Sequence, residues 1–288
     1  MSPSPKSNIL KTLASPSLIS LATAVIIIIA FKIDYPKYRA AVTDIESILE
    51  NPYNFFSDID QNGYSDRIFV VSNSIGTSGL AVKFFPSEFT LQWNFRGNYD
   101  FISNSFVSTG DADQDGFEEI SLATVVGDSV LLHIIGGYPS LHPILENRFI
   151  ATLGSKESKT DADIRFAAME DLNGDGSKEL IFMINSGFGL TPRNLYCYDI
   201  LKDSLAVSPY FGMSAGSIQQ GDLTGDGISE FTLCGYASDN LHSDTMSIHD
   251  QSSWLWVFTG MARPLFPPVE NPGIFGAVNA RFIPSSDP

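Results

Sequence analysis

From residue 51 onward, the chain alternates between short apolar runs and polar segments rich in glycine, aspartate and asparagine. The runs DIRFAAME, LIFMINS, NLYCYDI and LAVSPYFG follow one another between residues 163 and 212. Runs of about four to eight residues that are rich in β-branched and aromatic residues and bounded by turn formers are typical of β-strands. The pattern therefore predicts an all-β region built from four-stranded units.

Two other units fit the same pattern. The runs RIFVVSN, GLAVKFF and FTLQWNF follow Asp66, and FISNSFVS leads into the next unit. After FTLCGYA, the runs TMSIHD and SWLWVFT are expected to be the third and fourth strands of the last unit, which aligns Trp93 with Trp256 and Phe95 with Phe258. We expect these aromatic side chains to pack between units, because large rings dominate the energetics of cores.

A nine-residue acidic segment separates the first and second strands of every unit. Its four copies are DIDQNGYSD from Asp58, DADQDGFEE from Asp111, DLNGDGSKE from Asp171 and DLTGDGISE from Asp222, and their starts lie 53, 60 and 51 residues apart. Four-stranded units that recur at about this period and are arranged radially form a β-propeller. The sequence thus predicts a β-propeller of four-stranded antiparallel blades, four of them recognisable, with an eight-stranded sandwich as the alternative.

These acidic loops carry the candidate chemistry. Each has oxygen-bearing side chains at places 1, 3 and 5, glycine at place 6 and a carboxylate at place 9. Calcium prefers about six to eight oxygen ligands, and the glycine permits a sharp turn that brings the carbonyl at place 7 to the same point. We therefore expect about four structural calcium sites, in which the carboxylate at place 9 closes the shell, with both oxygens in its fullest form. The predicted ligands are Asp58, Asp60, Asn62, Tyr64, Asp66, Asp111, Asp113, Asp115, Phe117, Glu119, Asp171, Asn173, Asp175, Ser177, Glu179, Asp222, Thr224, Asp226, Ile228 and Glu230.

Other interpretations of the loops explain fewer of these features. An EF-hand needs a glutamate at place 12, and all four copies have an apolar residue there, followed by a strand-like run instead of a helix. Zinc is disfavoured because no loop contains His or Cys, and magnesium because it prefers a smaller octahedral site. Plain Asp/Gly hairpin turns that bind no metal stay open as the alternative.

The N-terminal part of the chain has a different pattern. TLASPSLISLATAVIIIIAF, between Lys11 and Lys32, contains no charged residue, and about 20 apolar residues span a bilayer as a helix. We expect a signal-anchor or transmembrane helix in residues 1–32, with a cleaved signal peptide and a buried core helix as alternatives. YRAAVTDIESILE has helical spacing, so residues 33–50 are expected to form a short helical stalk or linker before the repeat domain, residues 51–288.

Composition and charge narrow the function further. The formal net charge of −16 argues against a nucleic-acid partner, because phosphate binding needs clustered Lys and Arg. Cys197 and Cys234 lie in apolar runs and are expected to be buried free thiols, with a disulfide left open. The four histidines have no metal-ligand spacing, and no nucleophile motif is present, so we expect no enzyme activity. Asp199 and Asp250, which follow strand-like runs, are expected at turns.

An Asp-rich loop and a preceding Phe-Gly pair occur together in FGMSAGSIQQGDLTGDGISEFTLCGY, residues 211–236. In this respect the chain resembles FG-GAP/VCBS-type repeats, the calcium-binding blades also found in the integrin α-chain propeller, over about residues 51–288. The Phe-Gly lead is missing before the first three loops, and Asn62 and Thr224 depart from the acidic pattern, so the first and fourth sites are expected to bind calcium more weakly. Propellers of this family commonly have more blades, so GIFGAVNARFIPSSDP is expected either to enter a fifth loop of a longer protein or to close the ring.

The expected location and role follow from the calcium sites and the resemblance. Weak calcium sites fill outside the cytosol, so we expect a single-pass protein of the cell membrane whose repeat domain lies in the periplasm or at the cell surface, or a secreted protein if the signal is cleaved. The expected role is a binding module for a protein or glycan ligand, in adhesion, in recognition or as the sensory input region of a signalling receptor, a place where such repeats occur in bacterial membrane proteins. A lyase-like, polysaccharide-active enzyme built on a calcium propeller is the alternative.

Overall fold

The computed structural model of the chain describes residues 54–72, 78–95, 107–154, 162–186, 191–240 and 248–281. The chain divides into two compact units, Met1–Ser47 and Ile48–Pro288, and all described residues belong to the second. The membrane helix and stalk predicted for residues 1–50 lie outside the described residues. Within the described ranges, no helix combines the length and the apolar character that crossing a bilayer requires.

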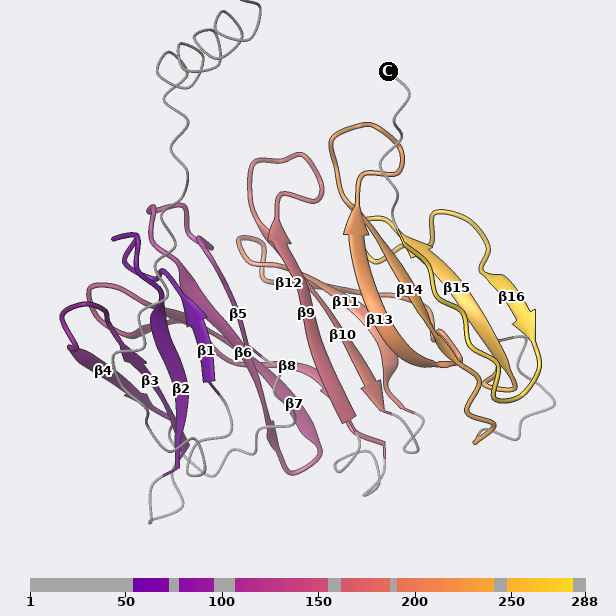
Figure 1. Ribbon diagram of the computed structural model, residues 1–288, viewed down its shortest axis with the longest axis horizontal. Helices are drawn as coiled ribbons and strands as arrows, with labels where there is room; N and C mark the ends of the chain where they lie inside the picture. The colour runs from indigo at the N-terminus through magenta and orange to yellow at the C-terminus, as the bar shows by residue number, and fades with distance from the viewer. Residues whose placement is uncertain are drawn as a thin grey trace, which may run out of the picture. The chain divides into compact units, whose positions relative to one another are not determined.

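The described residues form four antiparallel sheets, and each sheet consists of four strands that are consecutive in the chain (Figure 1). The first sheet contains β1 (Asn54–Ser57), β2 (Asp66–Ser72), β3 (Ser78–Lys83) and β4 (Thr90–Asn94). The second contains β5 (Val107–Gly110), β6 (Glu119–Val126), β7 (Ser129–Gly136) and β8 (His142–Thr152). The third contains β9 (Ala162–Glu170), β10 (Glu179–Ser186), β11 (Arg193–Asp199) and β12 (Ser204–Val207). The fourth contains β13 (Ser214–Gly221), β14 (Glu230–Tyr236), β15 (Ser252–Phe258) and β16 (Val269–Pro272). The predicted all-β class and the four-stranded antiparallel units are confirmed.

The third sheet is buried on both faces. Every residue of β10 is buried, and alternate side chains enter different cores, because successive residues of a strand point to opposite faces. Leu180 and Phe182 join a cluster that includes residues of the second sheet, whereas Ile181 and Met183 join a cluster that includes residues of the fourth. The third sheet therefore lies between the second and the fourth, which explains why LIFMINS is apolar at nearly every position.

The second sheet is packed in the same way between the first and the third. Ile120 and Leu122 of β6 belong to a cluster with Ile68 and Leu80 of the first sheet, whereas Ala123 belongs to the cluster that includes the third sheet. The four sheets are thus packed face to face in chain order (Figure 1). Burial of a large apolar side chain contributes roughly 1.5–3 kcal/mol, so these three clusters drive the stacking of the sheets.

One strand assignment made from the sequence is wrong. SWLWVF forms β15, which pairs directly with β14 and is therefore the third strand of the fourth sheet, while VENP forms the fourth strand, β16. Trp256 in β15 consequently does not correspond to Trp93 in β4. The aromatic run has the stronger strand propensity and fills the buried third position. Trp256 is 3% exposed and belongs to the apolar cluster that the third and fourth sheets share, so the packing between units predicted for this ring is confirmed.

The described residues after β16 fold back onto the fourth sheet. Pairing between β14 and β15 ends at Cys234, which leaves the next backbone groups of β14 available for other hydrogen bonds. Ala277 forms an antiparallel bridge with Tyr236, and the Val278 amide donates to the Gly235 carbonyl at 2.9 Å. The described part of GIFGAVNARFIPSSDP, up to Arg281, therefore belongs to the fourth sheet, and the expectation that it enters a fifth loop or closes the ring is wrong for these residues.

Two sequence predictions concern buried thiols, and both are confirmed. Cys197 and Cys234 are free cysteines that are 1% and 0% exposed. Burial raises the pKa of the Cys197 thiol to about 12, so this thiol stays protonated at neutral pH and behaves as a small apolar side chain.

A buried histidine makes the second sheet sensitive to acid. His133 of β7 is 0% exposed, its Nε2 lies 2.8 Å from Thr124 Oγ1, and its ring lies edge-on to Phe95 with centroids 4.7 Å apart. Burial lowers the pKa of His133 from 6.5 to about 4. The unfolded chain therefore binds a proton at this residue between these two pH values while the folded chain does not, and stability is lost as the pH falls from 6.5 toward 4.

We expect this residue to contribute about 3 kcal/mol to the loss of unfolding free energy on acidification, at about 1.4 kcal/mol per pKa unit. Denaturant unfolding of the wild type and of His133→Gln at both ends of this range measures it, because the variant should show a smaller acid-dependent loss. His142→Gln, at an exposed histidine of β8, is the matched control. Identical pH dependence in the wild type and His133→Gln would contradict the assignment.

Candidate metal-binding loops

Each acidic loop joins the first and second strands of one sheet and has the same backbone form. The residues at places 4 and 6 have positive φ in all four loops. They are Gln61 (55°) and Gly63 (87°), Gln114 (65°) and Gly116 (96°), Gly174 (76°) and Gly176 (86°), and Gly225 (76°) and Gly227 (87°). L-residues rarely adopt such angles, so the glycine at place 6 is required by the turn, as the sequence predicted. The loops are therefore four copies of one local structure.

The carboxylate at place 9 closes each loop from inside. Asp66, Glu119, Glu179 and Glu230 are 0–3% exposed. Each accepts a hydrogen bond from the backbone amide at place 2, and the acceptor–donor pairs are Asp66–Ile59 (3.0 Å), Glu119–Ala112 (2.6 Å), Glu179–Leu172 (2.8 Å) and Glu230–Leu223 (2.7 Å). A hydrogen bond from a backbone amide to an ionised carboxylate is stronger than a hydrogen bond between two neutral groups.

In two loops both oxygens of the place-9 carboxylate accept hydrogen bonds. Asp66 uses both oxygens for backbone amides, since its Oδ1 accepts from Phe85 at 2.9 Å. Glu179 also uses both, because its Oε1 accepts from Asn173 Nδ2 at 2.6 Å. These hydrogen bonds hold the loop and leave further lone pairs on each oxygen, so shell closure by the place-9 carboxylate, with one oxygen or with both, stays a prediction.

Places 1 and 5 hold the outer part of the loop. In the first, third and fourth loops the residue at place 1 accepts the amide of the place-6 glycine, and the pairs are Asp58–Gly63 (2.8 Å), Asp171–Gly176 (2.8 Å) and Asp222–Gly227 (2.9 Å). In all four loops the residue at place 5 accepts the amide at place 7, and the pairs are Asn62–Tyr64, Asp115–Phe117, Asp175–Ser177 and Asp226–Ile228, at 2.8–2.9 Å. The ligand role of the place-7 carbonyls stays a prediction.

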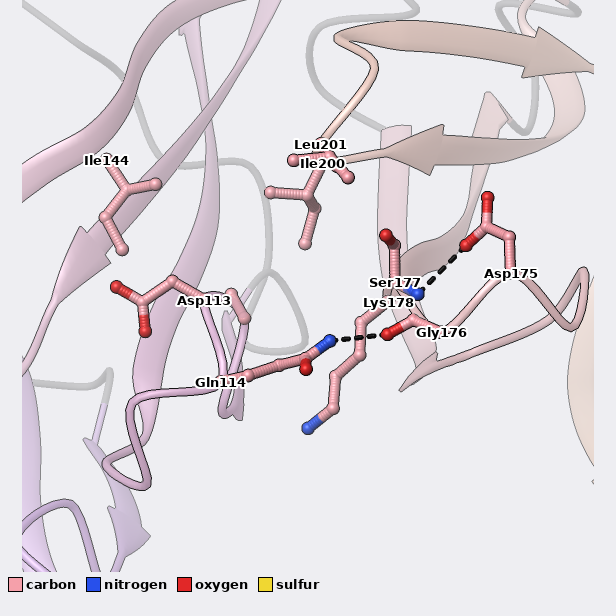
Figure 2. Close-up of a pocket in the computed structure, with 10 residues that line it drawn as sticks. Asp113, Gln114, Ile144, Asp175, Gly176, Ser177, Lys178, Ile200 and Leu201 are labelled. Atoms are coloured by element: carbon pink, nitrogen blue, oxygen red, sulfur yellow. Dashed lines mark hydrogen bonds between the residues drawn. The ribbon is translucent and has the colours of Figure 1, made fainter.

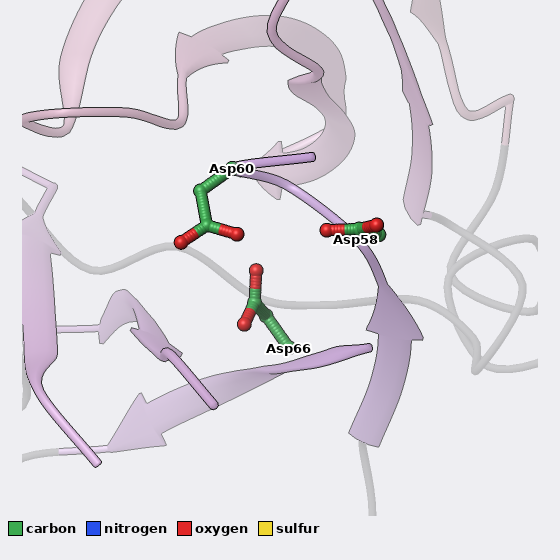
Figure 3. Close-up of side chains that lie close together, drawn as sticks. All are labelled: Asp58, Asp60 and Asp66. Atoms are coloured by element: carbon green, nitrogen blue, oxygen red, sulfur yellow. The ribbon is translucent and has the colours of Figure 1, made fainter. Parts of the chain in front are cut away.

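Carboxylate oxygens converge in the first two loops. Asp58, Asp60 and Asp66 each place an oxygen within 4.8 Å of the others (Figure 3). In the second loop Asp111, Asp113 and Asp115 do the same. Two like charges about 4 Å apart repel by about 1 kcal/mol in water and about 4 kcal/mol at an effective dielectric constant of about 20. These groups therefore suit a cation.

The second loop contains an additional sign of a missing partner. Asp111 Oδ1 is buried and has no hydrogen-bond partner among the described residues. Burial raises the pKa of Glu119 to about 7, with Asp113 and Asp115 as further causes, against the lowering effect of the backbone amides. A buried acceptor without a donor costs free energy. A bound cation would provide a partner for Asp111 Oδ1 and would hold Glu119 ionised.

The third loop gathers a different set of carboxylates. Asp175, Glu179 and Asp199 have oxygens within 4.8 Å of one another, whereas Asp171 is used for backbone amides. Asp199 ends β11 and its Oδ1 accepts the Lys202 amide at 2.8 Å, so it is a turn residue as expected, but it also faces the loop. The spacing within the nine-residue motif could not reveal Asp199, because this residue comes from the next hairpin.

The fourth loop does not gather its acids in this way. Among the described residues, no group of three potential ligands includes Asp222, Asp226 or Glu230. The Thr224 hydroxyl donates to Glu230 Oε1 at 3.5 Å, so the polar atom at place 3 points into the loop. Weaker calcium binding by the first and fourth loops stays a prediction.

A pocket of about 510 Å³ opens between the second and third loops (Figure 2). Its lining combines carboxylates and an ammonium with apolar side chains. The lining residues are Ala112, Asp113, Gln114, Ile144, Asp175, Gly176, Ser177, Lys178, Ile200 and Leu201. Gln114 Nε2 donates to the Gly176 carbonyl at 2.6 Å and links the two loops, while Leu201 is 77% exposed. The pocket thus offers apolar contact area beside the acidic loops.

These features define, for the described residues, an all-β architecture of four stacked four-stranded sheets with one acidic loop in each sheet. No protein-family model matches the chain, and no curated protein matches it. The resemblance to FG-GAP/VCBS-type repeats therefore stays a prediction that rests on the loop sequences.

Proposed function

We propose that the chain is a calcium-stabilised, β-propeller-type binding module without enzyme activity. In this proposal calcium ions bind in the acidic loops that gather carboxylates and hold the first two strands of those blades together, while the N-terminal apolar segment anchors the module to the extracytoplasmic side of a membrane. The net charge of −16 makes a nucleic-acid partner unfavourable. The ligand is a protein or a glycan.

The observation that carries the proposal is the second loop. Three carboxylates converge there, and one buried oxygen of Asp111 has no hydrogen-bond donor in the described part of the chain. Hard cations with flexible oxygen coordination suit such a site, which favours calcium over metals that prefer nitrogen or sulfur. Asp111, Asp113 and Asp115 would hold the ion in this loop, and Asp58, Asp60 and Asp66 would hold one in the first.

The pocket between the second and third loops supports a binding role. It places the exposed Leu201 and the aliphatic Ile144 and Ile200 beside polar loop groups. Binding sites commonly combine an apolar lining with a few fixed polar groups. A ligand seated there would contact two loops at once, and its affinity would depend on calcium because calcium would fix the second loop.

Capture of glycans from an array and of proteins from an extracellular fraction, each with calcium and with chelator, tests this function. We expect calcium-dependent capture, and about tenfold weaker capture by Leu201→Glu, since a buried unpaired charge costs more than 1.4 kcal/mol. Leu223→Glu, at a 50% exposed leucine of the fourth loop, is the matched control. Capture that is equal with and without calcium, or turnover of a polysaccharide, would contradict the proposal.

A further inference from the structure

The third loop differs from the other three because the neighbouring hairpin contributes an acid to it. Asp199 at the end of β11 pairs directly with Glu179 at the start of β10 in the strand register. In the other sheets the position that corresponds to Asp199 is the residue just beyond the last residue of the third strand that pairs with the second strand. These residues are Phe84, Gly136 and Thr259, and none of them is charged. Between its second and third strands, the third sheet thus places two carboxylates opposite each other where the other sheets place one. Glu170 of β9 lies opposite Glu179 on the other side, but it is exposed and accepts hydrogen bonds from Gln220 and Ser229 of the fourth sheet and its loop.

Such a pair is unfavourable unless a positive charge accompanies it. Glu179 and Asp199 are 0% and 2% exposed, and like charges directly opposite on neighbouring strands destabilise a sheet. Burial raises the pKa of Glu179, with the charges of Asp199, Asp175 and Asp171 as further causes, against the lowering effect of the Leu172 amide.

Lys202 supplies a positive charge from the turn that follows Asp199. Its Nζ donates to Asp175 Oδ2 and lies 2.8 Å from Asp199 Oδ2, so it bridges the loop and the hairpin. The turn fixes this position, because the Lys202 amide donates to Asp199 Oδ1 and the next residue, Asp203, accepts from Tyr198 Oη at 2.7 Å. The hydrogen bond from Lys202 is the main cause that lowers the pKa of Asp175.

We propose that the Lys202 ammonium is a tethered cation that takes the place of calcium at the third loop. This loop then stays closed without a bound ion, and calcium enters it only by displacing Lys202, whereas the first and second loops depend on calcium. The inference rests on the proposed function for those two loops, but the role of Lys202 in the absence of calcium does not. The four loops are therefore not equivalent, although their sequences are alike.

Lys202→Met in the full chain, held in detergent micelles, tests the proposal, with Lys178→Met as the matched control. Lys178 lies at place 8 of the same loop, so its replacement removes the same charge without removing the bridge. In chelator we expect Lys202→Met to melt about 3 °C below the wild type and Lys178→Met to melt with the wild type, since the exposed ammonium supports a partly screened ion pair.

Calorimetric titration with CaCl₂ gives the second result. We expect Lys202→Met to bind one more calcium ion per chain than the wild type, or to bind its weakest ion about tenfold more tightly, because a competing positive charge has been removed. Equal titrations and equal melting of Lys202→Met and the wild type in chelator would overturn the proposal. If the wild type bound no calcium at all, the proposed function would fail, while the melting comparison in chelator would still decide whether Lys202 stabilises the loop.

Discussion

Removal of calcium by a chelator is expected to lower the melting temperature of the full chain by about 10 °C or more. An ion that binds only the folded state adds roughly 2.7 kcal/mol at 100 times its dissociation constant. The first and second loops each gather three carboxylates within 4.8 Å, so the chelated protein also keeps their mutual repulsion. Thermal unfolding followed by circular dichroism, with excess CaCl₂ and with chelator, measures the difference.

The size of this effect should depend on pH in a defined direction. The pKa of Glu119 is raised from 4.5 to about 7 in the ion-free protein, mainly by burial. The folded chain then binds more protons at this residue than the unfolded chain between these values, so stability without calcium falls as the pH rises from 4.5 to 7. Bound calcium would hold the carboxylate ionised, and the chelator effect should therefore be larger at about pH 8 than at about pH 5.

A loop variant separates ion binding from general charge. Asp113→Asn/Asp115→Asn removes two of the three converging acids in the second loop. This variant should melt above the wild type in chelator, because repulsion is relieved, and below it in calcium, because a site is lost. Glu146→Gln, in β8 outside the loops, should leave both melting temperatures unchanged. A melting temperature of the wild type that is the same with and without chelator would exclude structural calcium.

Much of the fold could be predicted from the sequence because its signals are local. The runs that became β2, β3, β9, β10 and β11 are apolar, contain β-branched or aromatic residues and lie next to Gly or Asp turns. β16 has the sequence VENP, which carries almost no strand signal and consists of four exposed residues, so the sequence predicts the aromatic run SWLWVFT as the fourth strand instead. Its pairing with β15 is set by tertiary context, which local propensity does not contain.

For the candidate site, the sequence predicted only features that lie within a single loop. Places 1, 5, 6 and 9 have the positions that the motif implies, because their hydrogen bonds join residues two to seven positions apart. The contribution of Asp199 and Lys202 to the third loop comes from a different hairpin, 20 or more residues away, and depends on strand register. The motif also gave no indication that the place-9 carboxylate accepts the place-2 amide.

Arg193→Met is expected to destabilise the protein by about 3–5 kcal/mol, the cost of leaving a buried charge without its partner. Arg193 of β11 and Asp250, which lies in a turn before β15, are both 0% exposed, and Nη1 lies 3.5 Å from Asp250 Oδ2. The guanidinium also donates to the carbonyls of Ser186 and Gly212 and to Ser238 Oγ. The pair joins the third and fourth sheets, so its loss should weaken their contact.

The double variant Arg193→Met/Asp250→Leu distinguishes the ion pair from the volume of the side chain. Once both charges are removed, no unpaired ion stays buried, and we expect it to recover much of the lost unfolding free energy. Arg148→Met is the matched control, because its partner Asp203 has a side chain that is 63% exposed, and an exposed pair contributes about 1 kcal/mol or less. Denaturant unfolding of the wild type and the three variants gives the comparison. If Arg193→Met lost no more unfolding free energy than Arg148→Met, the two sheets would be held together by their apolar cluster alone. The expected result instead makes this junction depend on one buried charge pair, at the opposite end of β11 from Asp199.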